Sequence, residues 1–218
     1  MKLNQFPAVI FDMDGVLIDN HHAHFKAWMN FSHKYNFPLN DEIYLKDFNG
    51  KTNKDLFEMI FGEISEERFK DLVTEKEKMY QDIISKNLQE HRGLSVFLEF
   101  LKSRKIKLAV GTSAPTMNVD FILDGLDLRS YFDVVVDGLQ VAKGKPDPEI
   151  YLTCKKLLGV EKAIVFEDAL LGIEAGKRAQ CEVIGVATTH RRDELMGVVD
   201  LIVGDFTEAL KLFEDHEV

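Results

Sequence analysis

Six short runs of apolar, mostly β-branched residues recur along the chain, and helical patterns fill most of the intervals between them. The runs lie at residues 8–11, 106–110, 132–136, 163–166, 183–187 and 200–203. Short runs of this kind are typical of strands buried on both faces, and their alternation with helices is typical of a parallel sheet. We therefore predict an α/β fold with a doubly wound, mostly parallel sheet.

One interval breaks this rhythm, because about ninety residues separate the first run from the second, where a crossover usually needs about a dozen. Within it, apolar residues such as Phe25, Trp28 and Met29 recur at helical spacing. We predict a small all-helical cap at residues 19–89, inserted into a core of residues 1–18 and 90–218. Residues 19–22 and 86–92 are then the expected hinges on which the cap opens and closes.

Charge and cysteine usage exclude several classes of function. With 27 Lys and Arg against 37 Asp and Glu, the net charge of -10 disfavours binding to nucleic acid or to anionic membranes. Cys154 and Cys181 lack the spacing of a metal or redox motif, so both are expected to be buried, reduced thiols. No secretory signal or run of ~18 apolar residues is present, and we expect a soluble, cytoplasmic monomer.

Asp12 and Asp14 follow directly on the first apolar run, and Gly15 lets the chain turn after them. Open α/β sheets bind ligands just beyond the carboxyl ends of their strands. Two carboxylates held on one face repel each other unless a cation or a shared proton relieves the repulsion. The pair therefore predicts a divalent cation, with one aspartate attacking an electrophile while the other moves a proton.

Polar residues of a consistent kind follow three other runs or lie near them. They are Thr112 and Ser113, then Lys145, and then Glu167 and Asp168. Strand ends of a parallel sheet converge on one edge, so hydroxyl and amide donors, a cation and two more carboxylates are expected beside the aspartate pair. This set suits phosphoryl transfer, which needs in-line attack, neutralised phosphate charge and a bridging metal.

Each motif also has a purely structural interpretation. An isolated Asp-x-Asp-Gly is an ordinary turn, and Lys145 could be a surface lysine. Thr112 and Ser113 could cap the helix that follows, and a capped helix start is also an anion site. Glu167 and Asp168 could likewise cap a helix. Finding all of these motifs together, in this order, favours the catalytic interpretation.

In this order, the motifs resemble those of the haloacid dehalogenase superfamily, in its branch with a helical cap inserted after the first motif. The resemblance covers essentially the whole chain and implies a Rossmann-like core. It implies that Asp12 is the nucleophile that forms an aspartyl-phosphate and that Asp14 is the general acid and base. The remaining roles it implies are phosphate binding by Thr112 and the Ser113 N–H, orientation by Lys145, and Mg²⁺ binding by Asp12, the Asp14 carbonyl and Asp168, with Glu167 alongside.

The activity that this resemblance implies is a Mg²⁺-dependent phosphohydrolase acting on a small phosphorylated metabolite, and we expect a sugar monophosphate. The first alternative is a phosphosugar mutase of the β-phosphoglucomutase type, and inorganic pyrophosphatase is a further one. A binding module that kept the fold without catalysis is the alternative from another class. The complete set of catalytic residues argues against it.

The cap distinguishes the first two activities. His24 and Lys76 fall where the mutase has a His/Lys pair that couples cap closure to the acid/base aspartate. The mutase loop Leu-Lys-Gly-x-Ser-Arg, however, is replaced by residues 48–53, in which Asn49 and Asn53 stand where the mutase has its two cations. Asparagine cannot make the bidentate, charged hydrogen bonds that arginine makes to a phosphate. The replacement therefore favours a substrate with one phosphate group over a bisphosphate.

Several residues are expected to contact the substrate, and the neighbours of Lys76 are expected to be solvated. The predicted contacts are Ser113, Asn20, His24, Asn49, Lys51 and Lys76. Apart from Lys76, the charged run at residues 66–78 has the pattern of a solvated helix face.

Overall fold

The computed structural model describes residues 5–48 and 51–215. The chain divides into two compact units, one made of Met1–Asp19 and Gln89–Val218 and the other of Asn20–Leu88. They are called the core unit and the cap unit below.

The core unit is built on a six-stranded sheet of order β3-β2-β1-β4-β5-β6, and each of its strand pairings is parallel. The strands are β1 (Ala8–Phe11), β2 (Lys107–Gly111), β3 (Val134–Val136), β4 (Ile164–Glu167), β5 (Glu182–Val186) and β6 (Leu201–Val203). Their positions match the six apolar runs to within two residues, so the predicted parallel α/β sheet is confirmed. Sequence order reverses between β1 and β4, which is where such sheets bind ligands.

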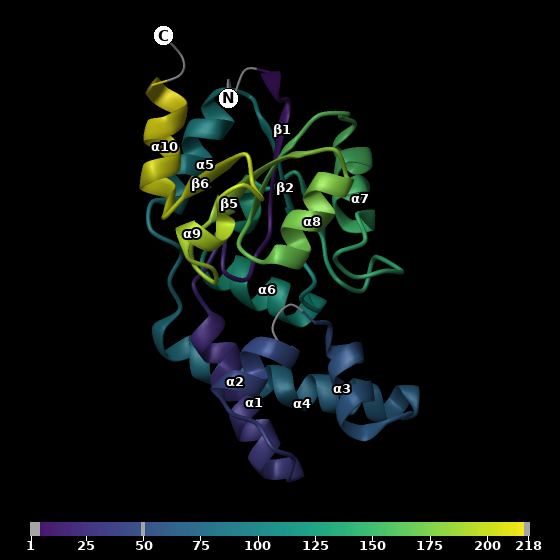
Figure 1. The fold of residues 1–218 in the computed structure, drawn as a ribbon. Helices are drawn as coiled ribbons and strands as arrows, with labels where there is room; N and C mark the ends of the chain where they lie inside the picture. Colours follow the sequence, from purple (N-terminus) through teal and green to yellow (C-terminus); the bar gives the residue numbers. More distant parts are fainter. Residues whose placement is uncertain (1–4, 49–50, 216–218) are drawn as a thin grey trace. The chain divides into compact units, whose positions relative to one another are not determined.

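Helices cover the sheet on both faces. They are α5 (Leu94–Ser103), α6 (Thr116–Gly125), α7 (Glu149–Leu158), α8 (Leu170–Arg178), α9 (Arg192–Leu195) and α10 (Phe206–Asp215), with a short 3-10 turn, η4, at Arg129–Tyr131. Helices α7 and α8 contact each other and strands β1 to β5, whereas α5 and α10 pack together beside β2 and β6 (Figure 1).

Alternation along β1 explains the two halves of the core, since successive strand side chains point to opposite faces. Ala8 and Ile10 join the aliphatic cluster formed with α7 and α8. Phe11 points to the other side, where its ring stacks on Phe166 with centroids 5.2 Å apart and meets Phe97 edge-on at 6.4 Å. Because β1 is packed on both faces, its position along the strand direction is fixed. This in turn places Asp12, the residue that follows β1.

The described residues of the cap unit form helices and turns. They are α1 (His21–Tyr35), α2 (Asp41–Ile43), the short π-helix η2 (Tyr44–Phe48), α3 (Asn53–Phe61), α4 (Glu66–Ile84) and the 3-10 helix η3 (Ser85–Asn87). Helix α1 ends on Asn36 in the left-handed conformation, with φ 61°. Thr52 and Asp55 form a reciprocal capping box at the start of α3. Helices α1 and α4 pack against each other around an aromatic core that includes Trp28 and Phe31.

Nothing within residues 5–48 and 51–215 resembles a membrane-spanning helix, since none of their helices is both long enough and apolar enough.

Candidate active site

Asp12 stands at the carboxyl end of β1, between the ends of β2 and β4. Its backbone N–H donates to the carbonyl of Phe166 at 3.0 Å, which continues the pairing with β4 by one residue. Its side chain is buried, with 8% of the residue exposed. The position is therefore set by the parallel ladder on either side.

Lys145 reaches Asp12 from the loop between β3 and α7. Its Nζ lies 2.8 Å from Asp12 Oδ1 and 2.5 Å from Glu167 Oε1, and 8% of its side chain is exposed. Burial opposes the charge on Lys145, yet the two carboxylates outweigh burial and raise the pKa of the ammonium. The amine is therefore a fixed cation held against one oxygen of Asp12, which rules out an ordinary surface lysine.

Glu167 is held by four donors. Its Oε1 accepts from Lys145 Nζ and from the hydroxyl of Tyr151, the latter at 2.7 Å. Its Oε2 accepts from the backbone N–H groups of Asp168 at 2.9 Å and Ala169 at 3.0 Å. This carboxylate therefore orients Lys145 and also braces the start of the turn that leads into α8, so the helix-capping interpretation and the site interpretation both apply.

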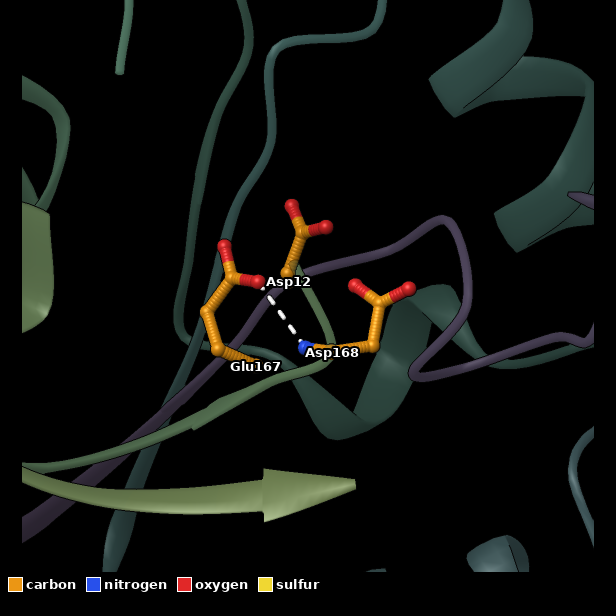
Figure 2. Close-up of side chains that lie close together, drawn as sticks. All are labelled: Asp12, Glu167 and Asp168. Atoms are coloured by element: carbon orange, nitrogen blue, oxygen red, sulfur yellow. Dashed lines mark hydrogen bonds between the residues drawn. The ribbon is translucent and has the colours of Figure 1, made fainter. Parts of the chain in front are cut away.

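Asp12, Glu167 and Asp168 bring three buried carboxylates together, with one oxygen from each within 4.8 Å of the others (Figure 2). Burial raises the pKa of the Asp12 carboxyl to about 7, although the ammonium of Lys145 opposes the shift. Burial, followed by the charges of Glu167 and Asp12, also raises the pKa of Asp168 well above its usual range. A buried group of three carboxylates beside a single ammonium carries excess negative charge, and carboxylate oxygens are the ligands that Mg²⁺ prefers. The donor set fits this ion.

The turn after β1 brings its backbone against the acidic cluster. Gly15 has a φ of +75°, and a Cβ on it would lie 2.0 Å from Asp168 Oδ2, so only glycine fits there. Leu17 N–H closes the turn by donating to the Met13 carbonyl at 2.8 Å. Asp14 lies in this turn and is half-buried.

Thr112 and Ser113 follow β2. Thr112 is buried, its N–H donates to the Val136 carbonyl, and its hydroxyl accepts from Ala114 N–H at 3.1 Å. Ser113 is exposed. The cap residue of α6 is Pro115, which makes no side-chain cap. The hydroxyl of Thr112 therefore braces its own loop and does not cap that helix.

The predicted contacts of the cap unit lie in two polar groups within that unit. Asn20 Nδ2 donates to the Tyr80 hydroxyl at 2.6 Å, and the His24 ring stacks on Tyr80 with centroids 3.9 Å apart. Lys76 is 2% exposed, and its Nζ lies 2.7 Å from Glu77 Oε1. Lys51 is exposed, and Asn49 lies outside the described residues.

The profile of haloacid dehalogenase-like hydrolases matches residues 9–186. The chain belongs to this family. A phosphorylated carbohydrates phosphatase of Thermotoga maritima is 42% identical over 180 residues, which cover 80% of this chain and 82% of the relative. A β-phosphoglucomutase of Bacillus subtilis is 34% identical over 189 residues, 82% of each chain. The crystal structure of a haloacid dehalogenase hydrolase from Entamoeba histolytica matches all of both chains with a TM-score of 0.84 and 31% identity.

Four residues of this hydrolase make contacts that the sequence analysis missed. Tyr151 holds Glu167, as described above. Thr189 Oγ1 donates to Asp168 Oδ2, and Thr188 Oγ1 donates to the Gly15 carbonyl at 2.6 Å. Glu77 was expected on a solvated helix face, but it is 1% exposed and also accepts from Asn53 Nδ2 at 2.7 Å. Burial would raise the pKa of Glu77, but Lys76 and His24 outweigh it and lower that pKa.

Gly172, on α8, leaves the space that Glu167 occupies, and a Cβ there would lie 1.7 Å from Glu167 Oε1. Because four donors fix that carboxylate, we expect Gly172→Ala to lower the free energy of unfolding by about 2 kcal/mol, as overpacking does. Urea denaturation measures the loss. Gly204→Ala is the matched control, since its Cβ would meet the end of an exposed arginine at 3.1 Å, and we expect a change below about 0.5 kcal/mol. Equal stability of the Gly172→Ala variant and the wild type would show that Glu167 is free to move.

Proposed function

We propose that this hydrolase is a Mg²⁺-dependent phosphatase that cleaves a small sugar monophosphate through a phosphorylated Asp12. The observation that carries the proposal is the contact of Lys145 Nζ with Asp12 Oδ1 at 2.8 Å, beside a buried acidic cluster. This contact fixes one oxygen of a carboxylate and neutralises charge where an anionic phosphate would arrive. A carboxylate held in this way is suited to nucleophilic attack on phosphorus.

The chain's own groups supply both halves of the reaction. An oxygen of Asp12 attacks phosphorus while the carboxyl of Asp14 gives its proton to the departing ester oxygen, so the P–O ester bond breaks as the acyl-phosphate bond forms. The Asp14 carboxylate then takes a proton from the water that attacks the phosphoryl group, and inorganic phosphate leaves with Asp12 restored. Thr112 and the N–H of Ser113 are the proposed phosphate donors.

The proposed metal ligands are Asp12, the carbonyl of Asp14 and Asp168, with Glu167 alongside them at the metal site. When bound, Mg²⁺ would neutralise phosphate oxygens and keep the nucleophile ionised. For Glu167 the four hydrogen bonds described above favour a supporting role, since they already engage both of its oxygens.

The cap unit supports a monophosphate over a bisphosphate. The Asn53 amide donates a hydrogen bond to Glu77, and the same carboxylate compensates the charge of Lys76. Asn53 carries no charge and Lys76 is already paired, so neither residue supplies a free cation for a second, non-reacting phosphate. The proposed substrate contacts in this unit are Asn20, His24, Asn49, Lys51 and Lys76.

The second candidate is the phosphosugar mutase activity. The Bacillus subtilis relative bears that name. His24 and Lys76 fall where the resemblance to the mutases implies a His/Lys pair. A mutase must protect the transferred phosphoryl group from water while the sugar bisphosphate intermediate reorients in the site. A phosphatase instead passes the phosphoryl group to water.

A panel of sugar monophosphates, pyrophosphate and β-glucose 1-phosphate with a bisphosphate primer tests the proposal. Free phosphate released rapidly from a few monophosphates is the expected result. An isomerised sugar phosphate without free phosphate would establish the mutase instead, and pyrophosphate as the best substrate would establish a pyrophosphatase. Size-exclusion chromatography of the same preparation tests the expected monomer.

A double variant with Asn53→Arg and Glu77→Gln tests whether these residues of the cap unit select a monophosphate over a bisphosphate. The change supplies a guanidinium and removes the carboxylate that would neutralise it, so the ratio of kcat/KM for bisphosphates to that for monophosphates should rise about tenfold or more. Lys54→Arg, on the exposed side chain next along α3, is the matched control and should leave the ratio unchanged. An unaltered ratio in the double variant would mean that these residues do not select the substrate.

A further inference from the structure

Two neighbouring threonine hydroxyls follow β5, and they donate hydrogen bonds to two different parts of the acidic site. Thr188 Oγ1 donates to the carbonyl of Gly15 at 2.6 Å, and Thr189 Oγ1 donates to Asp168 Oδ2. The loop that carries them is itself tied to the sheet, since Ala187 N–H donates to the Val203 carbonyl at 2.8 Å. The end of β5 therefore bridges the turn after β1 and the turn after β4.

One hydrogen bond and one close backbone contact restrict the Asp168 carboxylate. The backbone of Gly15 is so close to Oδ2 that an added Cβ would lie 2.0 Å from it, and Thr189 donates to the same oxygen. One oxygen of this carboxylate lies within 4.8 Å of an oxygen of Asp12 and of Glu167, in the buried group that Figure 2 shows. A carboxylate oriented in this way presents one defined oxygen to a cation.

The contact of Thr188 acts on the same site through the backbone. The Gly15 carbonyl is one peptide beyond the Asp14 carbonyl, which is one of the proposed metal ligands. Only φ and ψ of Gly15 separate the two carbonyls. A hydrogen bond that holds the Gly15 carbonyl therefore restricts the orientation of the peptide that carries the Asp14 carbonyl.

We infer that Thr188 and Thr189 are positioning residues for Mg²⁺, each orienting one of the ligands that would bind the ion. Hydrogen bonds to the groups that ligate a metal set its affinity, and loss of such a partner costs about 10- to 100-fold in binding. The inference rests on the metal site of the proposed function.

Isothermal titration of the phosphate-free protein with MgCl₂ tests the inference without any measurement of turnover. Thr189→Val keeps the shape of the side chain and removes the hydroxyl, so its Mg²⁺ dissociation constant should rise about 10- to 100-fold. Thr189→Ser restores the donor and should bind within about threefold of the wild type. Wild-type affinity in Thr189→Val, or equal weakening in Thr189→Ser, would overturn the inference for this residue.

Thr188→Val is a second test variant, and its result does not depend on whether the Thr189 variant folds. It should weaken Mg²⁺ binding by a smaller factor, because it acts through the backbone, and wild-type affinity would overturn its part of the inference. Thr116→Val is the matched control, since the Thr116 hydroxyl also donates to a buried carboxylate, that of Asp137, at 2.5 Å. It should leave Mg²⁺ affinity unchanged, and an equal loss there would show that any Thr-to-Asp hydrogen bond has this effect.

The wild-type titration separates the two levels of the argument. Absence of Mg²⁺ binding to the wild type would contradict the proposed metal site and, with it, the inference. Binding to the wild type and equally to both valine variants would contradict the inference alone. The midpoint of thermal unfolding as a function of MgCl₂ concentration should report the same order of affinities.

Discussion

Asp12→Asn should lower turnover of any phosphate ester by about 10⁴-fold or more, because the carboxamide has no anionic oxygen with which to attack phosphorus. Stopped-time phosphate release on the best substrate of the panel measures the loss. The amide occupies nearly the same volume as the carboxylate, so circular dichroism should show an unchanged fold.

Asp127→Asn is the matched control for this change. Asp127 is exposed and has a φ of 56°, a left-handed conformation that asparagine also accepts. We expect its turnover and stability to equal those of the wild type. Turnover retained within about tenfold in the Asp12→Asn variant would contradict a covalent role for Asp12.

Lys145→Met should have the second largest effect. The methionine keeps the aliphatic bulk and removes the ammonium that lies 2.8 Å from Asp12 and 2.5 Å from Glu167. We expect kcat to fall by about 10² to 10³, as when one preorganised donor to a developing negative charge is lost. Two buried carboxylates also lose their counter-ion, so the free energy of unfolding in metal-free buffer at neutral pH should fall by about 3 kcal/mol.

Lys143→Met separates this effect from the general loss of a lysine in the same loop. The side chain of Lys143 is 73% exposed, and its ammonium lies 3.7 Å from Asp147. An exposed pair of this kind contributes little, so kcat should not change and stability should shift by less than about 0.5 kcal/mol. Equal kinetic losses in the two variants would contradict a specific role for Lys145.

The sheet is predictable from the sequence because burial on both faces leaves a simple pattern. All positions of β1 are apolar, and so are those of β4 up to its last residue, Glu167, so the runs stand out and the strand ends can be located to within two residues. The convergence of strand ends then predicts that Asp12, Lys145, Glu167 and Asp168 approach one another, as they do in the core unit.

Thr188 and Thr189 could have been found by the same argument, since they follow the apolar run at residues 183–187 as Asp12 follows its own run. Tyr151 could not, because a tyrosine at helical spacing on α7 has the pattern of a core residue. Its hydroxyl meets Glu167 only once α7 packs against β1 and β2.

The cap unit shows the limit of charge patterns. Glu77 lies within a run of alternating charges that is typical of a solvated face, yet it is buried, as is Lys76, the one residue of the run that was expected to contact the substrate. Adjacent helical residues point about 100° apart, so which of them face inward depends on how α4 packs against its neighbours. Sequence spacing alone does not contain that information.

The central claim is that Asp12 carries the phosphoryl group during turnover, and acid quenching followed by peptide mass spectrometry tests it most directly. Enzyme mixed with its best substrate and Mg²⁺ and quenched within one turnover should yield a peptide bearing one phosphoryl group on Asp12, and the Asp12→Asn variant should yield none. Rapid phosphate release with no labelled Asp12 at any quench time, or with the label on another residue, would contradict the account.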